Sequence, residues 1–110
     1  MKKPIFPTFT IKDKDGAKEY LKQILLLVDY VRDLDLRLIV PVDAEKENTL
    51  NAADLWMPFA TDELNNAKSR LVNTNDNTSR VIDDALNQLH TVEPTIKSLL
   101  DYFDKMNGKS

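Results

Sequence analysis

The sequence predicts an all-α protein, an antiparallel bundle of three long helices preceded by an extended N-terminal arm. Three segments carry apolar residues at alternating steps of three and four, the spacing that lines one face of a helix. Only two of the 110 residues are glycine, which suits long helices better than a turn-rich β fold. The length allows one core of modest size, so residues 1–110 are expected to form a single helical-bundle domain.

The first helix is expected from about residue 17 to residue 38. Asp15 stands just before it as an N-cap, because its carboxylate can accept hydrogen bonds from the free amides of the first turn. Pro41 ends it, since proline pushes its predecessor out of the helical conformation. The apolar stripe consists of Ala17, Tyr20, Ile24, Leu27, Val31, Leu34 and Leu38.

The second helix is expected from about residue 50 to residue 72, with Asn48 or Thr49 as its N-cap. Alanine occupies one core position in three successive heptads, and such small residues let a neighbouring helix approach closely. We therefore expect a tight helix–helix contact here. The stripe consists of Leu50, Ala53, Met57, Ala60, Leu64, Ala67 and Leu71.

The third helix is expected from about residue 78 to residue 106, with Asp76 or Asn77 as the cap and Asn107-Gly108 as the stop. The heptad pattern breaks before it, in an asparagine-rich stretch that indicates a turn. The stripe consists of Ile82, Ala85, Leu89, Val92, Ile96, Leu99, Phe103 and Met106.

Two prolines, Pro58 and Pro94, fall inside the second and third helices but off their stripes. Each removes a backbone hydrogen bond, yet the apolar register passes through both without interruption. Kinked continuous helices are the first interpretation. The alternative is a break in which proline opens a new helix, and a break at Pro94 would give four helices.

The arm, residues 1–12, is expected to be extended. Residues 9–11 and 36–42 both alternate apolar and polar or branched side chains, so the two segments could pair as a short ribbon. Against the ribbon, Leu38 also completes the first helical stripe and Pro41 limits pairing.

Several large apolar residues face away from the stripes. Leu55 and Phe59 form an i, i+4 pair on the outer face of the second helix, with Trp56 beside them. Leu25 and Leu26 lie off the stripe of the first helix. One interpretation is that the arm folds back over one of these patches with Ile5, Phe6, Phe9 and Ile11, and the other is that the patches bind another protein or a second copy. Both can hold, one for each helix.

We find no candidate catalytic, cofactor-binding or metal-binding residues. The chain has no cysteine and a single histidine, His90, so neither a Cys/His nor a two-histidine metal site is expected in one chain. Every pair of neighbouring carboxylates falls outside the stripes, where burial would not separate their pKa values for acid–base work. Asp13-Lys14-Asp15-Gly16 resembles part of a calcium loop, but Ile11 would then occupy the first ligand position.

Composition excludes further classes of partner. The longest apolar run, from Ile24 to Val28, is far too short to span a membrane, and no signal peptide precedes it. A cytoplasmic location is therefore expected. The net charge of −3 supplies no basic footprint for nucleic acid. We interpret the lysines near the N-terminus as surface charge that keeps the protein soluble; they are Lys2, Lys3, Lys12, Lys14, Lys18 and Lys22.

These observations favour a non-catalytic protein that acts by protein–protein interaction, as an adaptor, inhibitor or immunity-type factor. The candidate binding residues are Leu55, Trp56, Phe59, Leu25 and Leu26. The alternative is a homodimer in which the helices of two chains complete one core. Association with nucleic acid is the weakest of the three hypotheses.

Overall fold

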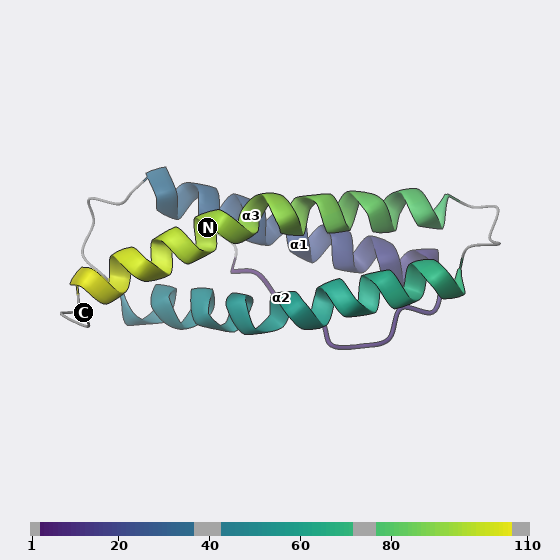
Figure 1. Ribbon diagram of the computed structural model, residues 1–110, viewed down its shortest axis with the longest axis horizontal. Coiled ribbons are helices and arrows are strands. Elements are labelled where there is room, and N and C mark those ends of the chain that lie inside the picture. Colours follow the sequence, from purple (N-terminus) through teal and green to yellow (C-terminus); the bar gives the residue numbers. More distant parts are fainter. Residues whose placement is uncertain (1–2, 37–42, 72–76, 107–110) are drawn as a thin grey trace.

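A computed structural model describes residues 3–36, 43–71 and 77–106 of the chain. It contains three helices, α1 (Lys14–Leu36), α2 (Ala44–Arg70) and α3 (Thr78–Met106), and no strand within these residues. The helices form an elongated bundle of 51 × 24 × 19 Å, with α2 antiparallel to α1 and α3 (Figure 1). The predicted all-α bundle is confirmed.

The core consists of the three apolar stripes. The described stripe residues are buried, apart from Leu71, which is half-buried, and Met106, which is exposed on the last turn of α3. Burying each large aliphatic side chain stabilises the fold by about 1.5–3 kcal/mol, so the stripes supply most of the driving force for folding. The three heptad alanines of α2, Ala53, Ala60 and Ala67, are completely buried.

The predicted helix starts need correction. α1 begins three residues earlier than expected, and the carboxylate that caps it belongs to Asp13 rather than Asp15, with the Gly16 amide donating to Asp13 Oδ1 at 2.9 Å. α2 begins six residues early, at Ala44, behind the N-cap Asp43. The extra turn of α2 is polar, so a search for apolar periodicity could not detect it.

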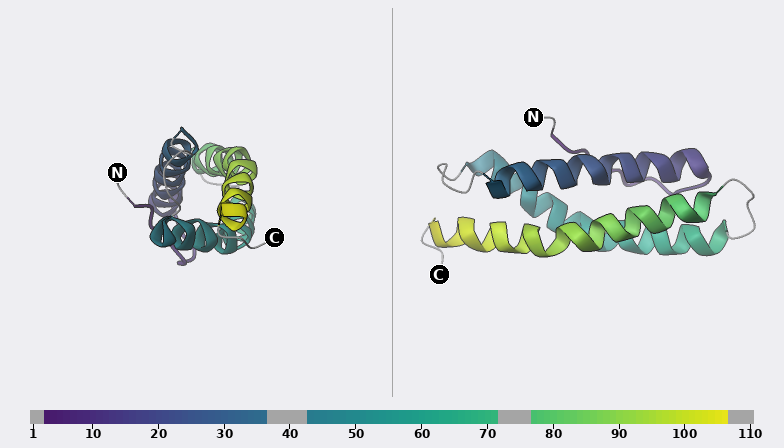
Figure 2. Two further views of the ribbon diagram at one scale, coloured as in Figure 1. Left: turned by 90° about the vertical axis from the view of Figure 1, so that its left-hand side faces the viewer. Right: turned by 90° about the horizontal axis from the view of Figure 1, so that it is seen from above.

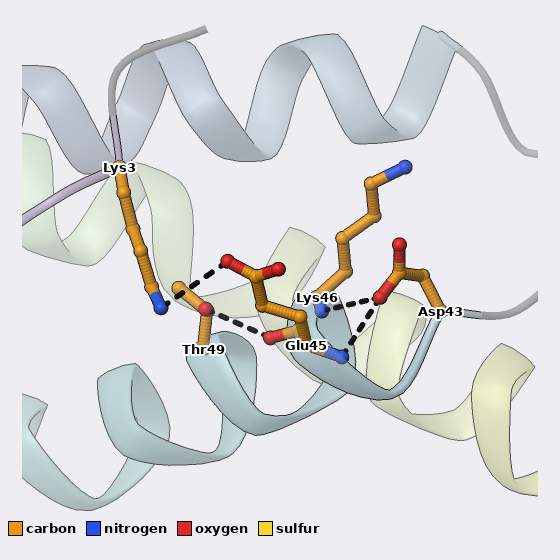
Figure 3. A network of polar contacts seen from close by, with 5 residues as sticks. All are labelled: Lys3, Asp43, Glu45, Lys46 and Thr49. Atoms are coloured by element: carbon orange, nitrogen blue, oxygen red, sulfur yellow. Dashed lines mark hydrogen bonds and ion pairs between the residues drawn. The ribbon is translucent and has the colours of Figure 1, made fainter.

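The cap of α2 is part of a polar network shown in Figure 3. Asp43 Oδ1 accepts from the Glu45 amide at 2.8 Å and from the Lys46 amide at 3.4 Å. Thr49, one of the two expected caps, lies inside the helix, where its hydroxyl donates to the Glu45 carbonyl at 2.9 Å. Glu45 also pairs with Lys3 of the arm at 3.5 Å.

Both prolines lie inside continuous helices, so the first interpretation is confirmed, and the described residues form three helices rather than four. Pro58 and Pro94 are exposed, which leaves the apolar stripes intact. α2 and α3 each change direction along their length in Figure 1, as expected for helices that lack one backbone hydrogen bond near their middle.

The helices do not contact one another equally. α1 and α2 each pack along α3, whereas little of α1 touches α2 directly. Residues 3–13 run without regular structure along the corner between α1 and α2, as the end-on view in Figure 2 shows. The arm therefore fills the open side of the bundle.

Some predictions fall on residues outside the described ranges. They are the stops at Pro41 and Asn107-Gly108, the stripe residue Leu38, the cap Asp76, and the ribbon partner 37–42. Residues 9–11, the other half of that ribbon, are not assigned to a strand.

Candidate protein-binding surface

The arm covers Trp56, the only tryptophan of the chain. The indole Nε1 donates to the carbonyl oxygen of Pro7 at 2.7 Å, and the ring lies 5.4 Å from that of Phe6 and 6.1 Å from that of Tyr20, centroid to centroid. Only 6% of Trp56 is exposed. Trp56 therefore belongs to the core. This agrees with the interpretation that the arm folds back over the apolar patch of the second helix.

Leu55 and Phe59 remain exposed on the outer side of α2. Leu55 is 80% exposed and Phe59 is 44% exposed, although both lie in the middle of a long helix. Phe59 is three residues after Trp56 and four before Glu63, so it shares the flank of α2 that contacts the arm. The arm leaves this pair as an apolar surface on α2, and two arm residues, Ile5 and Phe9, are themselves exposed.

A second apolar surface lies on α1. Leu25 is 42% exposed and Leu26 is half-buried, and with the half-buried Leu21 they line a shallow hollow of about 360 Å³. Lys18, Lys22 and Asp29 border it. The structure therefore places the two groups of predicted binding residues on different helices, as two separate patches.

A groove of about 300 Å³ between α2 and α3 contains His90. Its wall includes Pro58 and Glu93, and Lys97 pairs with Asp54 across it at 3.5 Å. His90 itself is exposed. Among the described residues, no three His, Cys, Asp or Glu side chains are grouped closely enough to hold a metal ion.

Two tyrosines of α1 have raised pKa values. Burial, assisted by the nearby Glu63 carboxylate, raises the pKa of Tyr20 to about 12. Burial also raises the pKa of Tyr30, with Glu45 and Asp43 adding to the effect and a hydrogen bond with Thr49 opposing it. Both phenols stay neutral at physiological pH, and the Tyr20 hydroxyl donates to the Phe9 carbonyl at 2.8 Å.

Sequence reasoning missed the polar residues that hold the arm. Arg70 donates to the carbonyl of Ile11 at 3.0 Å and pairs with Glu63 at 2.7 Å, and Glu63 accepts from the Ile11 amide at 2.8 Å. Trp56, Glu63 and Arg70 are spaced by seven, so the sequence places them on one flank of a helix. Nothing local in the sequence says that this flank receives the arm.

Comparison with protein-family models, with curated proteins and with solved structures found no match. Within the described residues, no helix is both long and apolar enough to cross a membrane.

Proposed function

We propose that this chain is a non-catalytic cytoplasmic protein that acts by binding another protein, as an adaptor, inhibitor or immunity-type factor. The proposed binding surface is the Leu55–Phe59 surface, defined as the exposed faces of these two residues on α2. Leu25 and Leu26 form a second surface, on α1.

The observation that carries the proposal is the exposure of Leu55. Leu55 is 80% exposed in the middle of a 27-residue helix. In the isolated protein its apolar surface stays in contact with water, so it contributes no hydrophobic free energy to the core. Phe59 extends this apolar surface by one helical turn. Exposed apolar patches mark interaction sites on soluble proteins, and aromatic side chains such as Phe59 are enriched at the centres of interfaces, where burial against a partner recovers the hydrophobic free energy.

The test compares two leucines that are equally exposed. Wild type, Leu55→Asp and Leu36→Asp are immobilised and exposed to a lysate of the native host, and the retained proteins are identified by mass spectrometry. Leu36 is 78% exposed at the end of α1, so Leu36→Asp controls for a new surface charge. A protein retained by wild type and Leu36→Asp, but not by Leu55→Asp, would be the expected result.

Affinity measured with the purified partner then gives the contribution of the surface. Leu55→Asp is expected to weaken the Kd by at least about 30-fold, the loss typical of a central interface residue. Equal retention by all three proteins would refute binding through this surface.

Self-assembly into a homodimer is the second candidate, and the α1 hollow favours it. Leu21, Leu25 and Leu26 give α1 an apolar face that the bundle leaves partly uncovered. Sedimentation equilibrium across a wide concentration range, on wild type and on Leu25→Asp, tests this candidate. A concentration-dependent dimer that Leu25→Asp abolishes would support it, and a monomer throughout would reject it.

A nucleic-acid partner is not part of the proposal. Lys3 pairs with Glu45, and Lys18 and Lys22 border an apolar hollow that also has Asp29 on its rim. An overall charge of −3 leaves little electrostatic attraction for phosphates.

A further inference from the structure

The N-terminal arm is bound to the helices as an extended peptide is bound to a receptor. Every second carbonyl, those of Pro7, Phe9 and Ile11, accepts a hydrogen bond from a helix side chain. An extended chain directs alternate groups to the same side, so this period of two matches its geometry. The donors are, in the same order, Trp56, Tyr20 and Arg70, at 2.7, 2.8 and 3.0 Å.

Backbone amides of the arm also donate hydrogen bonds to helix side chains. The Ile11 amide donates to Glu63 of α2 at 2.8 Å, and the Ile5 amide donates to Gln23 of α1 at 3.3 Å. Gln23 is buried and is itself held by a hydrogen bond to Glu19 at 3.0 Å. The corner between α1 and α2, here called the arm groove, therefore presents donors and acceptors matched to a peptide backbone.

The side chains of the arm fit the same groove. Ile11 is 1% exposed within the core, Pro4 is buried, and Phe6 packs on Trp56. In the described part of the chain, the backbone hydrogen bonds of the arm all go to side chains of α1 or α2. The arm makes none to itself, so it can leave the groove as a unit.

The connection between the arm and α1 is short and exposed. Only Lys12 and Asp13 separate the buried Ile11 from the first residue of α1, and both are exposed. The Asp13 carboxylate and carbonyl accept from Gly16 and Ala17, so these bonds belong to the helix start. Straightening the chain at Lys12 would redirect the arm without breaking them.

We propose that the arm groove accepts the arm of a second copy of this chain, giving an arm-exchanged dimer. This inference rests on the arm contacts alone and does not depend on the proposed partner surface. A second copy supplies the same carbonyls, amides and apolar side chains, so every contact of the arm is reproduced between chains. The exchange thus loses no arm contact and costs mainly the entropy of association.

The short connection also brings the two bundles together. Two residues span at most about 7 Å when extended, so the bundles of an exchanged dimer must touch near the start of α1. Phe9, which is 43% exposed, precedes Lys12 by three residues and is the exposed apolar residue of the arm nearest to this junction. Its burial in the dimer would offset part of the cost of association.

The experiment mixes two complementary full-length variants, one defective in its arm and one in its groove. Phe6→Asp/Ile11→Asp has an arm that cannot dock but an intact groove. Glu63→Ala/Arg70→Ala has an intact arm but a groove that lacks the side chains that bind Ile11. The expected result is a 1:1 heterodimer in analytical ultracentrifugation, at least about tenfold tighter than the self-association of either variant.

Circular dichroism of each variant alone verifies that its helices are formed before mixing. If both are helical and their mixture contains only monomers, the proposal is wrong. A heterodimer that forms equally well when the groove variant also carries Phe6→Asp would likewise contradict the proposal, because the arm would then not contribute to the association.

A change in the connection gives a second test that leaves the arm and the groove intact. Deleting Lys12 shortens the connection in which the chain turns from the arm into α1. The arm should then dock less easily in its own groove, and the dimer fraction of the otherwise wild-type chain should rise. Inserting two glycines after Lys12 lengthens this connection, so the arm should dock more easily in its own groove and the dimer fraction should fall. An unchanged dimer fraction in both variants, or shifts in the opposite directions, would overturn the proposal.

Discussion

The indole of Trp56 donates its hydrogen bond to Pro7, a residue 49 positions earlier in the chain. This contact joins the middle of α2 to the N-terminal arm, and the Trp56 ring lies 5.4 Å from that of Phe6 and 6.1 Å from that of Tyr20, centroid to centroid. The arm therefore completes the core between α1 and α2. In the described part of the chain, the core is built from three helices and one extended segment.

Trp56→Phe should destabilise the protein by about 1–2 kcal/mol. Phenylalanine keeps most of the ring packing but leaves the Pro7 carbonyl without its donor. The free energy of unfolding is measured by urea denaturation followed by circular dichroism, since the variant has no tryptophan. Trp56→Ala, which also creates a cavity, should cost about 3–5 kcal/mol. A Trp56→Phe variant as stable as wild type would mean that the arm is not docked through this bond.

The stability should fall at alkaline pH because of Tyr20. Its pKa is about 12 in the folded chain and about 10 when unfolded, so above pH 10 the unfolded chain loses the proton first. The contribution of Tyr20 is complete below pH 10 and is lost as the pH rises towards 12. The expected slope is up to about 1.4 kcal/mol per pH unit, and burial of Tyr30 acts in the same direction.

The control for this pH effect is Tyr20→Phe, which removes both the titrating hydroxyl and its bond to the Phe9 carbonyl. Its free energy of unfolding should be lower at neutral pH by about 1 kcal/mol and should fall less steeply between pH 10 and 12. Parallel pH profiles for the two proteins would contradict the assignment to Tyr20.

Two leucines of α2 should respond very differently to the same substitution. Leu64 is completely buried, so Leu64→Ala should cost about 2–5 kcal/mol, whereas Leu55→Ala should stay within about 0.5 kcal/mol of wild type. Phe59→Asp should also keep its helical circular dichroism, because nearly half of Phe59 is exposed. Unfolding of Phe59→Asp would place this face in the core and remove the main support for a binding surface.

Asp43→Ala should lower the stability by about 1 kcal/mol, because the Glu45 and Lys46 amides would lose their acceptor. Asn48→Ala is the matched control, since the sequence indicates Asn48 as a cap whereas the structure places it inside α2. Thermal denaturation of both variants distinguishes the two assignments. A larger loss of stability for Asn48→Ala than for Asp43→Ala would show that Asn48 is the N-cap, as the sequence suggested.

The sequence determined the helices and their buried faces because helical periodicity is a local property. Ala17 to Leu34, Leu50 to Ala67 and Ile82 to Phe103 carry the stripes, and their members are buried as predicted. The same regular spacing predicted continuity through Pro58 and Pro94. It could not find the true start of α2, because that turn contains no stripe residue and depends on the Asp43 cap.

Only the tertiary structure decided which apolar residues outside the stripes are covered. Leu55, Trp56 and Phe59 look alike in the sequence, yet the arm buries Trp56 and leaves Leu55 and Phe59 exposed. That outcome depends on hydrogen bonds and ring contacts between residues far apart in the chain, such as Trp56 to Pro7 and Arg70 to Ile11. Local periodicity specifies the face a helix buries, but the path of an irregular arm follows from such long-range contacts.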